Sequence, residues 1–75
     1  MEANLESVKK VIGDVLKIDS SNITEETNFI DDLKTDSMDQ FFLVEGFSDA
    51  FDITIDDDDA KNIKTVGDVL KLIVK

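Results

Sequence analysis

The sequence predicts an all-α fold, a small bundle of three main helices and one short helix. Apolar residues recur at intervals of three and four in three segments, over about residues 3–16, 37–51 and 66–74, which is typical of helices that bury one face. Only residues 52–55 alternate as a strand does, and a lone short strand has no partner. The 75 residues, 41% of them hydrophobic, have material for one core, so we expect a single domain over residues 1–75.

The first helix is expected over about residues 3–16, and a long polar connection follows it. The apolar face of this helix consists of Leu5, Val8, Val11, Ile12, Val15 and Leu16. The connection, from Lys17 to Asp36, is unusually long for so small a domain and is rich in Asp, Ser, Thr and Asn. Its scattered apolar residues are expected to hold it against the core: Ile18, Ile23, Phe29, Ile30 and Leu33.

The second helix is expected from Ser37 to about Phe51. Asp36 is suited to be its N-cap, another acid follows at Asp39, and the apolar pattern begins at Phe41. If Phe47 is at the centre of the buried face, steps of about 100° per residue place four other apolar residues on the same face of the helix. These are Leu43, Val44, Ala50 and Phe51. The opposite side carries Met38, Phe42, Glu45 and Asp49, and two of these four are large and apolar, which packing alone does not require.

The rest of the chain is expected to form an extended link, a short helix and a final helix. Residues 52–55 form the link, and the aspartates 56–59 suit the first turn of a short helix because the helix dipole favours acids there. Four consecutive aspartates lack the alternating ligands and central Gly of a calcium-binding EF-hand loop. Thr65 and Asp68 resemble a capping box ahead of a helix over about residues 66–74.

The composition excludes several kinds of chemistry. Neither Cys nor His occurs, which excludes disulfides, thiolate or imidazole metal sites, and Ser–His or Cys nucleophilic catalysis. A formal charge of -10 would repel nucleic acid and anionic lipid surfaces. No apolar run is long enough to cross a bilayer, and the first residues lack the cationic start of a secretory signal. We therefore expect a cytoplasmic protein without membrane insertion, and we also expect it to be a monomer.

The negative charge is concentrated in the middle of the chain. Residues 25–59 contain thirteen acidic residues and a single basic one, Lys34, a local balance of -12. This is either a solvated acidic face that keeps the protein in solution or a guide for partner proteins with basic surfaces, which speeds their encounter.

Ser37 stands at the predicted start of the second helix. A serine there is most often only a cap, and with no His in the chain it has no base to activate it. The segment Leu33–Asp39, however, resembles the acyl carrier protein family, whose signature is Asp-Ser-Leu at the start of the second helix. The resemblance extends over nearly the whole chain, through Val8–Leu16, Phe29–Leu33, Phe51–Ile55 and Ile63–Val69.

The resemblance implies that Ser37 is the site where a separate transferase attaches phosphopantetheine from coenzyme A. It also implies that Asp36 helps the transferase to hold magnesium. The chain would then be a discrete carrier without catalysis of its own, which holds acyl groups as thioesters in fatty acid synthesis or in a specialised lipid or polyketide pathway. Its partners would be the phosphopantetheinyl transferase and acyl-loading and acyl-processing enzymes with basic or mixed basic and apolar surfaces. They would contact Met38, Asp39, Phe42, Glu45 and Asp49.

Some positions depart from the common family pattern. Lys34 and Thr35 replace a Gly and a small residue, Met38 replaces Leu, and Asp56 stands where Pro is frequent. Phe42 stands where many fatty-acid-synthesis members carry an acid, which favours a specialised pathway. Two other functions remain open: an unmodified interaction or scaffold module, which the intact triplet Asp36-Ser37-Met38 disfavours, and a calcium-responsive protein, which the ligand spacing disfavours.

Overall fold

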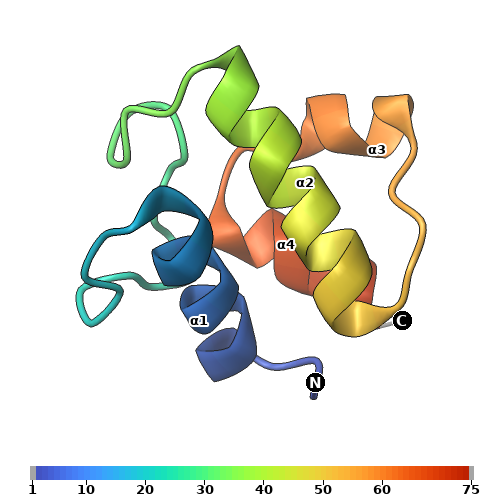
Figure 1. The fold of residues 1–75 in the computed structure, drawn as a ribbon, viewed down its shortest axis with the longest axis horizontal. Helices are drawn as coiled ribbons and strands as arrows, with labels where there is room; N and C mark the ends of the chain where they lie inside the picture. The colour runs from blue at the N-terminus through green and yellow to red at the C-terminus, as the bar shows by residue number, and fades with distance from the viewer. Residues whose placement is uncertain (1, 75) are drawn as a thin grey trace.

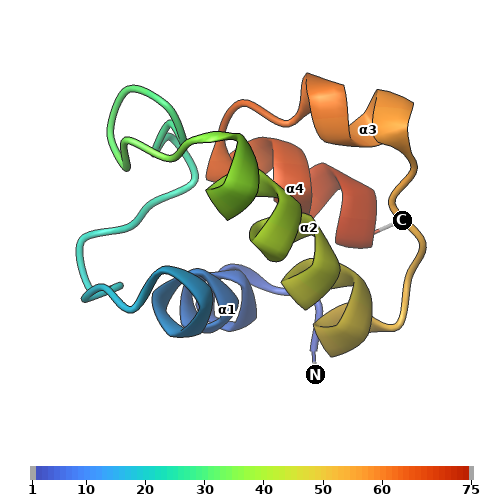
Figure 2. The same ribbon diagram turned by 45° about the horizontal axis from the view of Figure 1, so that its top comes forward.

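The computed structural model describes residues 2–74, which form four helices. These are α1 (Leu5–Leu16), α2 (Ser37–Phe51), α3 (Asp57–Asn62) and α4 (Val66–Ile73). They confirm the predicted all-α bundle of three main helices and a short one, and within residues 2–74 the only β pairing is an isolated bridge between Asn28 and Thr65. α1 contacts both α2 and α4. α3 lies on the far side of α2 from α1 (Figures 1 and 2).

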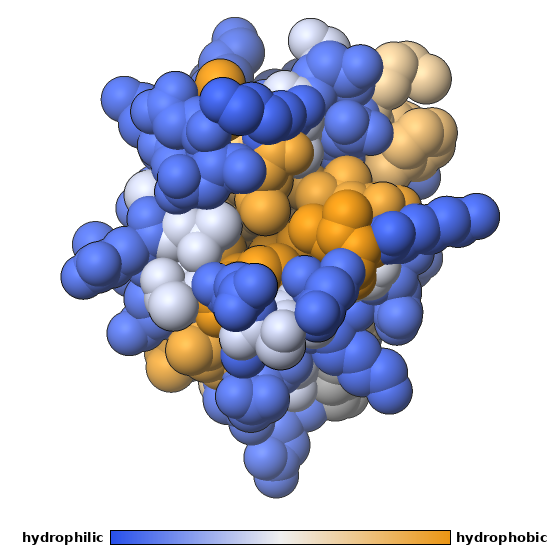
Figure 3. Space-filling view, turned by 90° about the vertical axis from the view of Figure 1, so that its left-hand side faces the viewer, coloured by the Kyte–Doolittle hydropathy of each residue, from blue (hydrophilic) through white to orange (hydrophobic). Residues whose placement is uncertain are grey.

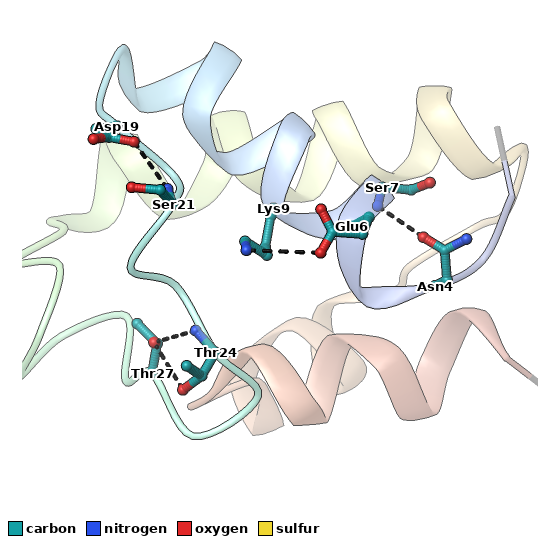
Figure 4. A network of polar contacts seen from close by, with 8 residues as sticks. All are labelled: Asn4, Glu6, Ser7, Lys9, Asp19, Ser21, Thr24 and Thr27. Atoms are coloured by element: carbon teal, nitrogen blue, oxygen red, sulfur yellow. Dashed lines mark hydrogen bonds and ion pairs between the residues drawn. The ribbon is translucent and has the colours of Figure 1, made fainter.

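α1 begins two residues later than the sequence pattern indicates. Asn4 has extended backbone angles and acts as the N-cap, because its side-chain Oδ1 accepts a hydrogen bond from the Ser7 N–H at 2.9 Å (Figure 4). The helix therefore starts at Leu5, and it ends at Lys17, whose left-handed backbone (φ 57°) is a common helix terminator.

The core is formed by the three long helices together with the α1–α2 connection. Its buried members are Val8, Val11 and Ile12 of α1, Ile23 and Phe29 of the connection, Leu43 and Phe47 of α2, and Val66, Val69 and Ile73 of α4. α3 contributes no buried residue of its own. Of the five apolar residues expected to hold the connection, Ile23 and Phe29 are buried and Leu33 packs against the core, whereas Ile18 and Ile30 are exposed.

Backbone hydrogen bonds tie the connection to the start of α4. The Phe29 N–H donates to the Lys64 carbonyl at 3.0 Å, and the Val66 N–H donates to the Thr27 carbonyl at 3.0 Å. The Gly67 N–H donates to the Glu25 carbonyl at 2.8 Å, and a Cβ at position 67 would stand only 3.1 Å from that oxygen. The glycine therefore lets the connection approach α4 closely.

Short-range hydrogen bonds also pair backbone N–H groups of the connection with nearby side chains. The Thr27 hydroxyl accepts from the Thr24 N–H at 2.9 Å, and the Asp19 carboxylate accepts from the Ser21 N–H at 2.9 Å (Figure 4). The Ser21 hydrogen bonds hold the pKa of Asp19 below its ordinary value, because they stabilise the ionised carboxylate.

The remaining helix boundaries are close to those expected. α2 spans the predicted residues, and residues 53–55 belong to no helix or strand. α3 begins after Asp56, whose side chain caps the Asp59 N–H at 2.8 Å. The predicted capping box of Thr65 and Asp68 is present, and α4 ends at Ile73, one residue early. None of the helices within residues 2–74 has the length and apolar character needed to cross a membrane.

Candidate functional site

A tight turn stands directly before α2 and is organised by Asn28. The Asn28 side-chain Oδ1 accepts hydrogen bonds from the N–H groups of Ile30 (2.8 Å) and Asp31 (2.9 Å). The Asn28 N–H in turn donates to Asp32 Oδ2 at 2.7 Å. The side chains of the turn thus satisfy its own backbone donors.

Thr35 anchors the segment between this turn and α2. Its N–H and its hydroxyl both donate to the Phe29 carbonyl oxygen, at 3.0 and 2.9 Å, and the residue is buried. Phe29 is itself part of the core, and its N–H donates a hydrogen bond to the Lys64 carbonyl. The backbone that leads into α2 is thus fixed to the core two residues before Ser37.

The first turn of α2 is closed by a capping box. Asp36 Oδ1 accepts from the Asp39 N–H at 2.9 Å, and Asp39 Oδ2 accepts from the Asp36 N–H at 3.3 Å. The prediction of Asp36 as the N-cap is confirmed, and the reciprocal bond from Asp39 completes the cap. One oxygen of each carboxylate is therefore engaged in holding the helix start.

Ser37 is the first residue of α2 and is exposed. Within residues 2–74, the N–H groups of Ser37 and Met38 donate to no acceptor. Unpaired N–H groups and the helix dipole favour an anion at the start of a 15-residue helix, whereas the carboxylates of Asp36 and Asp39 oppose one. The serine hydroxyl is accessible to another protein, and a group attached to it would project into solvent.

A groove of about 590 Å³ runs beside Ser37, along the side of α2 that faces α3. Its lining is mixed polar and apolar: Ser37, Gln40, Phe41, Val44, Glu45, Ser48, Asp49, Ile55, Asp57 and Ala60. Behind it, a much smaller apolar cavity of about 20 Å³ lies next to the core residues Leu43 and Phe47.

The outward side of α2 presents large apolar side chains beside acids. Met38 is 62% exposed and Phe42 is 47% exposed, and Glu45 and Asp49 are exposed as well. This agrees with the helical angles, and no neighbouring loop of the described chain covers the Phe42 ring. Asp39, the other acid expected here, is half-buried by its capping role.

Phe41 also belongs to this exposed surface, although the prediction from the sequence assigns it to neither face of the helix. Its side chain is 57% exposed and its ring meets that of Phe42 edge-on, with centroids 6.0 Å apart. The same helical angles would have found it, because position 41 lies about 120° from Phe47. We call Met38, Phe41 and Phe42 the apolar patch.

The surface around the connection shows the same mixture of characters. Apolar side chains reach the surface in the middle of the face drawn in Figure 3 and continue toward its upper right, with hydrophilic side chains around them. Of the connection residues on the surface, Ile30 is the most exposed large apolar one, with Ile18 next. Exposed apolar groups within a polar rim are typical of contact surfaces.

The acids near Ser37 are not neutralised by neighbouring bases. The ion pair recorded among residues 2–74 joins Lys9 to Glu6 at 3.8 Å within α1, and α2 contains no basic residue. Across the same residues no group of three or more acids is arranged to hold a metal ion. The site is therefore an exposed hydroxyl in a field of negative charge.

The chain is similar to proteins of known family in both sequence and structure. The family model described as the phosphopantetheine attachment site matches residues 6–73. The acyl carrier protein of Caulobacter vibrioides is 46% identical over 71 residues, which cover 95% of this chain and 91% of that protein. The acyl carrier protein of Phenylobacterium zucineum is 48% identical over 69 residues, with coverages of 92% and 87%. A solved structure assigned as an acyl carrier protein of Mycobacterium tuberculosis superposes with a TM-score of 0.82 at 41% identity and covers 93% of this chain and 92% of that one.

Proposed function

Because the chain belongs to the acyl carrier protein family, whose domain carries a phosphopantetheine attachment site, we propose that Ser37 is the residue that receives the phosphopantetheine arm. The observation that carries the proposal is the placement of Ser37, an exposed hydroxyl at the first position of α2 next to the capping residue Asp36. The other serines of the described chain, Ser7, Ser20, Ser21 and Ser48, do not follow an N-cap aspartate.

The attachment step requires only a nucleophile from this chain. The Ser37 oxygen forms a bond to the phosphorus that bears the pantetheine, and the bond from that phosphorus to the nucleotide part of coenzyme A breaks. The hydroxyl proton leaves to a base, which the transferase would supply. The product is a phosphodiester, for which the free N–H groups of Ser37 and Met38 are suitable donors. The Asp36 carboxylate oxygen outside the capping bond is a candidate ligand for the transferase's magnesium.

The loaded protein would act as a carrier for acyl groups. A thioester on the arm's thiol would be presented to each enzyme at a high effective concentration, because the carrier's docking makes the delivery intramolecular. Carrying requires no catalytic residue in this chain. We place the carrier in fatty acid synthesis or in a specialised lipid or polyketide pathway, and the apolar patch favours the latter.

Partner enzymes would dock on the outward side of α2. Met38, Phe42, Glu45 and Asp49 offer apolar contacts next to negative charge, Phe41 extends the apolar part, and Asp39 contributes charge at the helix start. A complementary partner has an apolar pocket flanked by Lys or Arg.

The test is the intact mass of the protein after incubation with coenzyme A and a purified phosphopantetheinyl transferase. The wild type should gain the mass of one arm, Ser37→Ala should gain none, and Ser48→Ala, a change in the same groove, should gain it normally. Circular dichroism should show that Ser37→Ala remains helical. A Ser37→Ala protein that still gains the arm would refute the assignment, and a wild type that gains nothing would favour the scaffold function.

A further inference from the structure

Lys34 has a backbone conformation that its residue type disfavours. Its φ is 56°, in the left-handed region that favours glycine, and its N–H closes the turn onto the Ile30 carbonyl at 3.2 Å. The other described non-glycine residues with positive φ, Lys17 and Asp52, terminate α1 and α2, where this conformation is common. Lys34 ends none of the four helices. It therefore occupies a position where a glycine would adopt the same backbone with less strain.

The charge of Lys34 is also exceptional in its surroundings. It is the only basic residue between positions 25 and 59, a stretch with thirteen acids. The side chain is exposed, and within residues 2–74 no carboxylate lies within the 4.0 Å of an ion pair with it. Its ammonium group is therefore available to an added anion.

Lys34 lies within reach of Ser37. Three residues of chain span at most about 10–11 Å, and lysine has a flexible four-carbon stem. The intervening backbone is fixed, because Thr35 is bonded twice to Phe29 and Asp36 is held in the capping box. The Cα of Lys34 is therefore held at a fixed place in the main chain, three residues before Ser37.

A phosphodiester on Ser37 would add negative charge to a site that already has two carboxylates, and a nearby cation would offset it. The two free N–H groups at the start of α2 favour the new negative charge, but the carboxylates of Asp36 and Asp39 repel it. We propose that the Lys34 ammonium is the counter-ion of the phosphodiester on Ser37 and positions the base of the arm. This inference rests on the proposed attachment at Ser37.

The experiment compares the arm-free and arm-bearing forms of three proteins: the wild type, Lys34→Gln and Lys10→Gln. Gln keeps the backbone strain at position 34 and removes the charge. Lys10 is an exposed lysine of α1 that lines a groove without Ser37, so its variant is the matched control. Intact mass verifies complete modification before each measurement.

The first readout is the shift in melting temperature on attachment of the arm. At about 10 mM salt, where charges act over about 30 Å, the arm should lower the midpoint of Lys34→Gln by about 2–5 °C more than that of the wild type. At about 1 M salt the difference should vanish. Lys10→Gln should respond to the arm as the wild type does.

The second readout is the ³¹P NMR signal of the phosphodiester, which reports its surroundings directly. At low salt the signal should differ between the wild type and Lys34→Gln and coincide between the wild type and Lys10→Gln. If the arm-bearing proteins lack either the salt-dependent midpoint difference or the signal difference at Lys34, the inference is overturned and the attachment site stands. If the wild type takes no arm at Ser37, the proposed function falls, and the inference falls with it.

Discussion

At the scale of single residues, Phe42 tests whether the apolar patch is a contact surface. Its side chain is about half exposed and is not part of the buried core. Phe42→Ala should therefore change the melting temperature little, while it impairs transfer of cargo by a cognate enzyme, because an aromatic contact residue commonly contributes about 2 kcal/mol or more to binding. Thermal melts and partner turnover on the same preparation provide the measurement.

The matched control is a buried phenylalanine of the same helix. Phe47→Ala removes a fully buried ring and should destabilise the fold by about 3–5 kcal/mol. A stability loss of that size at Phe42, with turnover per folded molecule unchanged, would mean that Phe42 serves packing and not recognition.

Lys34 allows a second prediction at this scale, on the protein without its arm. Since φ at position 34 is 56°, Lys34→Gly should relieve strain and raise the free energy of unfolding, by up to about 1 kcal/mol. Urea unfolding of the two arm-free proteins measures it. Lys34→Ala, which keeps a Cβ, should show no comparable gain in stability. If Lys34→Gly were no more stable than the wild type, the turn would carry no strain at Lys34.

At the scale of elements, the start of α4 depends on the ionised carboxylate of Asp68. Its Oδ2 accepts from the N–H groups of Lys64 (2.9 Å) and Thr65 (3.1 Å), and these bonds hold the pKa of Asp68 below its ordinary value of about 3.9. A carboxyl whose pKa is lower in the folded state stabilises the fold above its unfolded pKa. That contribution is lost as the pH falls through the folded pKa.

Asp68→Asn should therefore be less stable than the wild type at pH 7, by about 0.3–1 kcal/mol, the scale of a charge at a helix N-terminus. The difference should shrink as the pH falls below about 4 and the wild-type carboxyl becomes protonated. Thermal melts of both proteins from pH 7 to pH 2 measure it. Asp14→Asn, which removes an exposed acid of α1, should show no such loss of stability. If the stability difference between Asp68→Asn and the wild type grew as the pH fell, the capping role of Asp68 would be contradicted.

The helix boundaries depend mainly on local contacts. The start of α2 and the capping box of α4 follow from residues three apart, because a cap depends only on contacts within one turn. The end of α2 at Phe51 follows from the apolar periodicity. The start of α1 was misplaced by two residues, because Asn4 acts as its cap and good helix formers surround that position.

At the scale of the whole molecule, unpaired negative charge should limit stability. The formal charge is -10, and the ion pair recorded among residues 2–74 is a single one on α1. Screening should relieve the repulsion, so the melting temperature should rise with NaCl, and with calcium through screening and weak association. If micromolar calcium stabilises strongly while NaCl has no effect, a specific cation site exists and the diffuse account is wrong.

The sequence alone predicts the four helices, the N-terminal caps of α2 and α4, the exposure of Met38 and Phe42, and the candidate serine at the start of α2. These follow from periodicity and from contacts between residues a few positions apart, which act before any tertiary structure forms. The tertiary structure decided how the long connection is held: residues 25–29 bond to residues 64–67, and Thr35 bonds to the carbonyl of the buried Phe29. It also decided that Ile23 is buried while Ile30 is exposed, and that Lys34 takes a left-handed backbone. The pairing of residues 25–29 with residues 64–67 depends on segments nearly forty residues apart meeting in one core, and no local pattern encodes that meeting.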